Sequence, residues 1–334
     1  TGAPKGLAIL QKNVVNFSQW CFTDAFQMSA RDVYLWQSSI SFDMIIGTLF
    51  WTAQSGGRLC SITDGYETNS SYIFHAVQRS GTTMMFIVPS HLSALMVDGL
   101  TGASVRHIMV GGEALSSRFG VSCSAAFERA IVVNAYGPTE TTVGVTCFEI
   151  KERMMTMHFG ASIPVGKPFY NCTVKIRNKD QKVLISGAQV GAGYLNLAGK
   201  TRATFLYDFY ESNNNGSQNM YSCGDCATHT ICGDVLFLGR VDDQVKVSGQ
   251  RVELGAVESA LLSCPQVSQC TVVVMGGDST AAASKWLAAC VVLRDEYRAT
   301  TSESDLRSQV SRTVARHEVP QRIVIVERIP LTTA

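Results

Sequence analysis

Short apolar runs alternate with longer amphipathic stretches through the first part of the chain. Runs of this kind, bounded by turn-forming residues, predict buried strands at 33–36, 82–88, 105–110 and 130–133. Between these runs the pattern predicts helices at 44–53, 72–79, 91–97 and 119–129. Strands that alternate with helices indicate an α/β fold, with a layered, mostly parallel sheet as its core.

After Glu149 the pattern changes to shorter strands and turns, which predicts a β-rich subdomain with strands at 172–176, 182–186 and 237–240. A small C-terminal α+β lobe is expected beyond Asp242. It would contain a hairpin at 244–253, helices at 256–263 and 304–317, and strands at 270–275, 286–293 and 323–326. Ser302 and Asp305 have the spacing of a capping box at the start of the second helix.

With 334 residues the chain is long for one core, so we expect two domains, 1–241 and 242–334. Hydrophobic residues make up 46% and charged residues 16%, which is typical of a globular protein. A net charge of +1 gives no reason to expect nucleic acid or an anionic membrane as a partner. The first residues do not resemble a signal peptide, and no apolar run approaches the roughly 20 residues of a membrane span, so we expect a cytoplasmic protein.

Eleven cysteines are scattered along the chain, and only Cys223 and Cys226 form a C-x-x-C pair. A redox pair or half of a zinc site is one interpretation of that spacing. No second pair completes a set of zinc ligands, so reduced thiols are the expected state.

Residues 134–142, Asn-Ala-Tyr-Gly-Pro-Thr-Glu-Thr-Thr, carry the strongest chemical pattern. An apolar strand leads into a Gly-Pro turn, beyond which hydroxyls and one carboxylate are crowded onto a strand end. Hydroxyls bind phosphate oxygens and Glu140 offers a hard oxygen ligand for magnesium, while the ring of Tyr136 could lie against a base. The alternative interpretation is an ordinary turn followed by solvated threonines.

Six further segments accompany this stretch in a fixed order: 1–6 (TGAPKG), 42–43 (FD), 111–115 (GGEAL), 187–195 (GAQVGAGYL), 221–225 (YSCGD) and 239–246 (GRVDDQVK). The set resembles the motifs of adenylate-forming enzymes, and specifically the adenylation domains of nonribosomal peptide synthetases. The resemblance covers essentially the whole chain. It implies a ligase that uses ATP and Mg²⁺ to convert an α-amino acid to an aminoacyl adenylate. The acyl group then passes to a phosphopantetheine thiol on a carrier domain outside this chain, so the implied partners are carrier-protein and condensation domains of a parent polypeptide.

The resemblance also implies roles for individual residues. Lys5, Thr139 and Glu140 would act on the phosphates, with Glu140 as the magnesium ligand. The implied nucleotide-binding residues are Thr1, Gly2, Gly111, Gly112, Glu113, Asn134, Tyr136, Asp225 and Arg240. Asp225 and Arg240 would hold the ribose, Asn134 and Tyr136 the adenine, and Asp242 would be a hinge between the two domains.

Asp43 opens a predicted helix, where it is either an N-cap or, as the resemblance implies, the carboxylate that pairs with the substrate ammonium group. The implied substrate pocket consists of Asp43, Met44, Gly47, Phe86, Met109, Gly111, Ala135, Val143 and Gly144. Apart from Asp43 these residues are apolar, and their small members leave volume. We therefore expect a large hydrophobic substrate, aromatic rather than aliphatic, unless Gly47 or Gly111 serves backbone geometry alone.

The chain departs from the family pattern in several places. Thr1 falls inside the implied phosphate-binding loop, and the chain ends just before the implied terminal lysine motif. Cys223 stands at a threonine position, and a short connection precedes Lys182. We therefore expect a fragment of a larger polypeptide that is poorly active alone. The alternatives are an acyl- or aryl-CoA ligase of the same superfamily, which would not need Asp43, and a nucleotide-binding remnant without activity.

Overall fold

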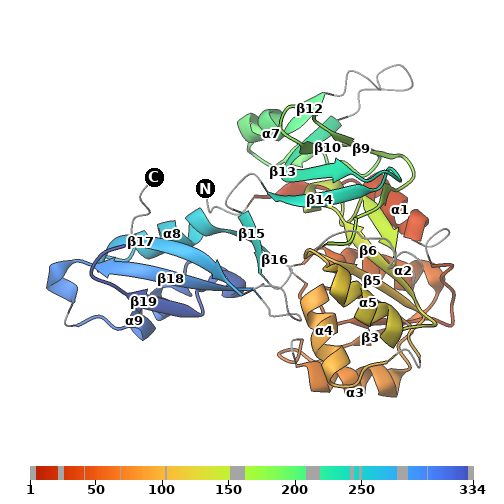
Figure 1. Cartoon of the computed structure of the whole chain (residues 1–334), viewed down its shortest axis with the longest axis horizontal. Helices are drawn as coiled ribbons and strands as arrows, with labels where there is room; N and C mark the ends of the chain where they lie inside the picture. The colour runs from red at the N-terminus through yellow and green to blue at the C-terminus, as the bar shows by residue number, and fades with distance from the viewer. Residues whose placement is uncertain are drawn as a thin grey trace. The chain divides into compact units, whose positions relative to one another are not determined.

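The computed structural model describes residues 5–21, 26–40, 42–67, 69–101, 104–150, 162–207, 219–240, 244–247, 250–276, 285–298 and 300–329. The chain divides into two compact units, Lys5–Val241 and a second unit that includes Asp242–Ala334. Each unit has its own core and is described separately (Figure 1).

The largest sheet among the described residues lies in the first unit and has seven strands in the order β3-β2-β4-β5-β6-β7-β8. The strands are β2 Val33–Trp36, β3 Arg58–Ser61, β4 Met84–Ile87, β5 His107–Gly111, β6 Ile131–Tyr136, β7 Thr146–Glu149 and β8 Lys167–Pro168. The first five strands in this order are parallel, and β7 and β8 are antiparallel to their neighbours. The predicted α/β fold with a mostly parallel sheet is confirmed.

The two faces of this sheet are covered by different helices, α1 Gln11–Trp20 and α2 Met44–Ser55 on one face and α3 Ser70–Ser80, α4 Pro89–Val97 and α5 Ser117–Ala126 on the other. Strand side chains alternate between faces. Along β4, Met85 and Ile87 pack with the α3–α5 helices, and Met84 and Phe86 pack with α1 and α2. We call the latter cluster the α1–α2 core.

A second, antiparallel sheet follows in the same unit, in the predicted β-rich region. It contains β9 Cys172–Ile176, β10 Lys182–Gly187, β12 Phe205–Tyr207, β13 Asn219–His229 and β14 Val235–Arg240. The long strand β13 pairs with β10, β12 and β14. A short pair, β1 Leu7–Ala8 and β11 Gly193–Tyr194, lies before the helix α7 Ala198–Thr204.

Two expectations for the region around residue 134 were wrong. The strand predicted at 130–133 continues to Tyr136, because β7 pairs with it through Ala135↔Cys147 and Tyr136↔Thr146. The threonines that follow do not lie on a strand end. Thr139–Thr141 form a short 3₁₀ helix, η2, after the Gly-Pro turn.

The second unit contains the hairpin β15 Gln244–Val247 and β16 Gln250–Glu253, and a sheet in the order β17-β18-β19. The sheet strands are β17 Val267–Met275, β18 Trp286–Leu293 and β19 Arg322–Ile325, and helices α8 Leu254–Leu262 and α9 Glu303–Val310 share their core. The helix expected at 304–317 ends early, at Val310. The hydroxyls of Ser311 and Thr313 donate to the carbonyls of Ser308 and Val310 and so compete with helical bonding.

Candidate functional site

Residues 137–144 follow β6, and we call them the β6 loop. The loop turns so sharply that the backbones at its two ends lie close together. A Cβ on Gly137 would lie 2.6 Å from the Cα of Gly144, so only glycine fits there. Thr142 and Val143 are buried with φ of 59° and 69°, a region that β-branched residues rarely adopt. The N–H of Gly144 donates to the carbonyl of Thr142 at 2.8 Å, which is the hydrogen bond of a strained γ-turn.

Glu140 lies in η2 with only 4% of its surface exposed. Its Oε1 accepts a hydrogen bond of 2.6 Å from the hydroxyl of Tyr194. The Nζ of Lys5 lies 6.0 Å from the centroid of the Tyr194 ring, and the β1–β11 pair holds the backbones of Leu7 and Tyr194 side by side. The structure thus brings Lys5 near Glu140 through Tyr194, a residue of the 187–195 segment to which the sequence assigned no role.

Asp225 is the second buried carboxylate beside β6. Its Oδ2 accepts a hydrogen bond of 2.6 Å from the Tyr136 hydroxyl, and its Oδ1 accepts one from the guanidinium of Arg240. The register of β13 and β14 places Asp225 directly opposite Arg240. Burial, followed by the nearby Cys223 and Asp225, holds the pKa of Tyr136 well above its usual value, so the hydroxyl remains a donor.

Asn134 lies on β6 near Tyr136, but its side chain is directed elsewhere. Its Nδ2 donates to the backbone carbonyl of Pro164 at 2.9 Å, and the residue is buried. The side chain therefore connects β6 to the segment before β8. A base beside Tyr136 could accept a hydrogen bond from the Asn134 amide only if the bond from Nδ2 to Pro164 were broken, or if Nδ2 donated to both acceptors at once.

Two glycines lie at the end of β5, Gly111 as its last residue and Gly112 directly after it. Gly111 pairs with Ala135, and a Cβ on Gly111 would lie 2.9 Å from the Ala135 carbonyl oxygen. Gly112 has a φ of 90°. The Glu113 carboxylate accepts 3.0 Å bonds from the N–H and the hydroxyl of Ser90 in the first turn of α4. The backbone of Gly111 and Gly112 thus lies beside the site, whereas the Glu113 side chain is bound to a helix N-terminus.

The implied substrate residues gather in the α1–α2 core. Met44, Phe86, Met109, Ala135 and Val143 all belong to it. Asp43 precedes α2, is partly buried, and makes no side-chain cap bond to that helix. A carboxylate at this place is therefore not explained by N-capping.

Two aromatic side chains that the sequence analysis missed fill part of this core. A Cβ on Gly47 would lie 3.2 Å from the rings of Phe17 and Trp51, and one on Gly144 would lie 3.6 Å from Phe17. The ring centroids of Phe17 and Trp51 are 5.6 Å apart. The one available signal was the spacing of Gly47 and Trp51, which places both on the same face of α2.

The residues present suit a magnesium ion bound together with phosphates. Mg²⁺ in such sites takes one or two carboxylates and completes its shell with phosphate oxygens and water. Glu140 provides a buried carboxylate at the loop, and Thr139 is an exposed hydroxyl beside it. Among the residues that the structure describes, no group of three or more His, Cys, Asp and Glu side chains is placed to hold a metal by itself.

Cys223 and Cys226 are three residues apart on β13 and therefore face opposite sides of its sheet. Their thiols donate to the carbonyls of Val183 and Asp180, respectively. Thr1, Gly2 and Asp242, three of the implied site residues, lie outside the described residues. Within the described ranges, the structure contains no helix long and apolar enough to cross a membrane.

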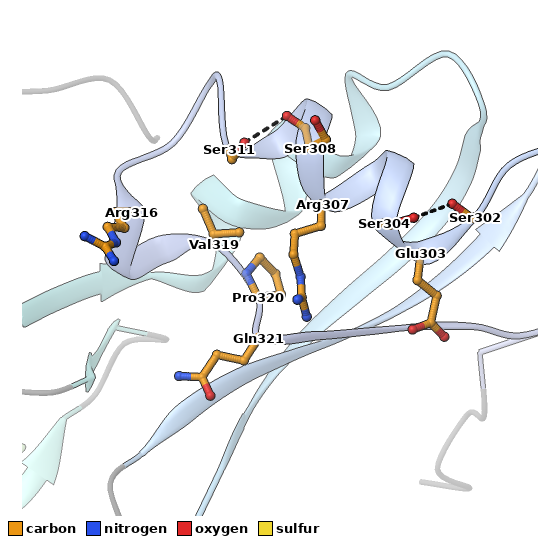
Figure 2. A pocket seen from close by; sticks show the side chains of 10 residues that line it. All are labelled: Ser302, Glu303, Ser304, Arg307, Ser308, Ser311, Arg316, Val319, Pro320 and Gln321. Carbon is orange, nitrogen blue, oxygen red and sulfur yellow. Dashed lines mark hydrogen bonds between the residues drawn. The ribbon is translucent and has the colours of Figure 1, made fainter.

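The second unit has a hollow of about 890 Å³ on its surface, formed by α9 and the segment before β19. Figure 2 shows the lining side chains, among them Arg307, Arg316 and Gln321. None of the implied site residues lies in this hollow.

Comparison with known proteins gives consistent matches over both units. The family model described as AMP-binding enzyme matches residues 1–202, and that described as AMP-binding enzyme C-terminal domain matches residues 256–334. The chain is 32% identical over 293 residues to zwittermicin A synthase ZmaJ of Bacillus cereus, covering 82% of the chain and 54% of that protein. It is 31% identical over 349 residues to tyrocidine synthase 2 of Brevibacillus parabrevis, covering 99% of the chain and 9% of that protein. The chain thus spans about half of the first relative and a small part of the second.

Solved structures agree with this fold. The Vibrio cholerae adenylation domain AlmE, in complex with glycyl-adenosine-5'-phosphate, matches with a TM-score of 0.82 and 25% identity, over 99% of this chain and 62% of that one. Holo-PA1221, an NRPS protein containing adenylation and PCP domains, matches with a TM-score of 0.83 and 23% identity, over 99% of this chain and 56% of that one. Since the first family model covers more than half of the residues, including the whole β6 loop, the chain belongs to the AMP-binding enzyme family.

Proposed function

We propose that this chain activates an α-amino acid with MgATP, giving an aminoacyl adenylate and pyrophosphate. One observation carries the proposal. Two buried carboxylates, Glu140 and Asp225, lie beside the end of β6, and each accepts a 2.6 Å hydrogen bond from a tyrosine hydroxyl. The apolar α1–α2 core lies beside the same strand. Polar nucleotide-binding groups and an apolar acid-binding region thus meet at one strand end, which is where ligands bind in parallel α/β sheets.

The residues divide into two groups around the nucleotide. Asp225 retains lone pairs for the ribose hydroxyls while Tyr136 and Arg240 hold its carboxylate in place. Asn134, the Tyr136 ring and the backbone of Gly111–Gly112 would take the adenine. Glu113 would contribute through its position beside these glycines, because its carboxylate is bound to Ser90.

The phosphates would lie on the other side, against Lys5, Thr139 and Glu140, and we propose that Thr1 and Gly2, which precede Lys5 in the sequence, also bind them. Glu140 would hold Mg²⁺, which would supply positive charge to the phosphates. A substrate carboxylate oxygen forms a bond to the α-phosphorus, and the bond to the oxygen that bridges the α- and β-phosphates breaks, so pyrophosphate leaves with the electron pair. The Lys5 ammonium group offsets part of the charge on the leaving group, as fixed charges do in other phosphoryl transfers.

We propose that a second step transfers the acyl group to the phosphopantetheine thiol of a carrier domain, within a polypeptide that also has condensation domains. PA1221 offers a parallel, since it contains adenylation and PCP domains. In this proposal residues 1–241 form the adenylation core and residues 242–334 a small lobe, with Asp242 as the hinge between them.

The substrate would be a hydrophobic amino acid. Asp43 offers a carboxylate for the ammonium group, and the other implied pocket residues, Met44, Gly47, Phe86, Met109, Gly111, Ala135, Val143 and Gly144, carry no charge. A charged or amide side chain there would lose its hydrogen bonds to water at a cost of roughly 1–3 kcal/mol for each unpaired group. AlmE, which holds a glycyl adenylate, supports the aminoacyl class of substrate.

ATP–pyrophosphate exchange by the full-length polypeptide, measured on a panel of acids, tests this proposal. We expect exchange with hydrophobic amino acids and its loss for the deaminated analogues. Asp43→Ala should reduce exchange at least tenfold while nucleotide binding is retained. Equal activity on deaminated acids would favour the CoA-ligase alternative, and nucleotide binding without exchange on any acid would favour an inactive remnant.

A further inference from the structure

Gln189 is completely buried between β10 and β11, and both ends of its side-chain amide are engaged. Its Nε2 donates to the carbonyl of Gly144 and lies 3.4 Å from the carbonyl of Thr142. Its Oε1 accepts a 2.9 Å bond from the Nδ2 of Asn16 in α1. The backbone carbonyl of Gln189 also accepts a 2.8 Å bond from the hydroxyl of Thr142.

The carbonyls that Gln189 binds belong to the strained turn in the β6 loop. Thr142 and Val143 both have positive φ, and strained backbone of this kind persists only where its surroundings hold it. A buried carbonyl without a partner costs about 1–3 kcal/mol. The carbonyl of Thr142 already accepts from the N–H of Gly144, so the Gln189 amide removes this cost chiefly for the carbonyl of Gly144, which follows the turn.

The amide is itself held in one orientation. The Nδ2 of Asn171 donates to the Oδ1 of Asn16 at 2.9 Å, and Asn16 in turn donates to Gln189. In this series of hydrogen bonds, from Asn171 to Asn16 to Gln189 to Gly144, each donor is directed toward the β6 loop. A reversed Gln189 amide would set its NH₂ group against that of Asn16 and its oxygen against the loop carbonyls.

We propose that Gln189 is a positioning residue for the substrate side of the site. Its amide fixes the turn that carries Val143 and Gly144, two implied pocket residues, against the α1–α2 core. The role of Val143 and Gly144 rests on the proposed function. The Gln189 Nε2 also lies 3.5 Å from the carbonyl of Thr141, but Glu140, on the nucleotide side of the same loop, has a bond of its own: its carbonyl accepts a 2.9 Å bond from the N–H of Gly191. Loss of the Gln189 amide should therefore affect the amino acid more than ATP.

The test compares Gln189→Met, which keeps the length and loses the hydrogen bonds, with Asn13→Leu in the full-length polypeptide. Asn13 is equally buried, and its Nδ2 donates to the carbonyls of Ala188 and Val190 on either side of Gln189. It anchors the same segment, and its side-chain hydrogen bonds join it to Leu10, Ala188 and Val190, which lie outside the β6 loop. We expect Gln189→Met to raise the KM for the amino acid at least tenfold and that for ATP less than threefold. Asn13→Leu should lower thermal stability and leave the ratio of the two KM values unchanged.

A third variant, Gln189→Glu, should make the amino-acid KM depend on pH, which a loss of packing alone would not do. In Gln189→Glu an ionised carboxylate would face the loop carbonyls, whereas a protonated carboxyl can donate to one of them. Burial raises the pKa of such a group. The amino-acid KM of this variant should therefore fall toward the wild-type value as pH is lowered from 8 to 6, and that of Gln189→Met should not.

Hydrogen exchange of the amides at 141–145 separates this proposal from the proposed function, because it needs no turnover. Exchange there should quicken at least tenfold in Gln189→Met and stay as in the wild type in Asn13→Leu. Unchanged exchange in Gln189→Met, or an equal rise of the amino-acid KM in both variants, would overturn the positioning role. A wild-type polypeptide that activates no acid, with loop exchange still dependent on Gln189, would overturn the proposed function alone.

Discussion

At the scale of single residues, the site depends on carboxylates whose neighbours fix their orientation. Asp225 accepts one bond from Tyr136 and one from Arg240, and so presents its remaining lone pairs in one direction. The two partners come from different strands, β6 and β14, so the carboxylate also connects the two sheets of the first unit.

Tyr136→Phe tests this arrangement because it keeps the ring and removes the hydroxyl. A hydrogen bond to a charged group contributes about 1.5–3 kcal/mol, so we expect the KM for ATP to rise roughly tenfold or more while the amino-acid KM changes little. Tyr72→Phe is the matched control, because Tyr72 lies on α3 and its hydroxyl bonds that of Thr63, between β3 and α3, away from the site. An unchanged KM for ATP in pyrophosphate exchange would contradict the role of the hydroxyl.

His107 gives a prediction about stability. It begins β5, is buried, and packs 5.2 Å from the ring of Phe26. Burial, reinforced by the charge of Arg106, lowers the pKa of His107 to about 4. The unfolded chain, with an ordinary histidine pKa, binds the proton more readily, so the stability due to neutral His107 is present above pH about 6.5 and is lost as pH falls toward 4.

Urea unfolding between pH 7 and 4 should show this loss as a fall of up to about 3 kcal/mol in the free energy of unfolding. His107→Leu should reduce the pH dependence and leave the part due to His91, whose pKa burial also lowers, whereas a variant of His75, which is exposed on α3, should keep all of it. If His107→Leu retains the full slope, other groups account for the acid sensitivity.

At the scale of elements, the local sequence pattern was enough to predict the strands and helices of the parallel sheet. It was not enough to predict elements that form by contact with residues far away in the sequence. β2, β9 and β18 have the predicted bounds, because apolar runs and turn residues mark them. α1 was missed because it buries a polar Asn13 and a Ser18 besides Phe17, so it has no continuous apolar face. β6 was predicted too short, since its last residues are ordered by pairing with β7.

The start of α9 is an element whose local signal was confirmed. Ser302 Oγ accepts from the N–H of Asp305 at 3.2 Å, and Asp305 Oδ2 accepts from the N–H of Ser302 at 2.9 Å. Ser302→Ala should lower the free energy of unfolding by about 1 kcal/mol, the usual effect of losing an N-cap. Ser308→Ala, in the last turns of the same helix, should have a smaller effect. Equal losses in thermal unfolding would mean that the cap contributes nothing specific.

At the scale of the whole molecule, residues from four segments far apart in sequence meet in the α1–α2 core. Phe17, Trp51, Phe86 and Phe169 come from α1, α2, β4 and the segment before β9. The ring centroids of the pairs Phe17–Trp51, Trp51–Phe86 and Phe17–Phe169 are 5.6, 5.7 and 6.2 Å apart. Motif matching found Phe86 and missed the other three, because their contacts exist only after the sheet has formed. They also occupy space beside Gly47 and Gly144, so those glycines accommodate protein rings and leave less volume for a substrate than the sequence suggested.

The division into two compact units falls between Val241 and Asp242, the residue that the family resemblance implies as a hinge. If the two half-reactions need different arrangements of the units, the backbone at Asp242 must adopt more than one φ value. Proline fixes φ near −65°, so Asp242→Pro should permit one half-reaction and block the other. Asp242→Ala leaves φ unrestricted and should retain both.

Pyrophosphate exchange and loading of the carrier thiol, measured separately in the full-length polypeptide, report the two steps. Equal loss of both in Asp242→Pro, accompanied by a lower melting temperature, would assign Asp242 a purely structural role.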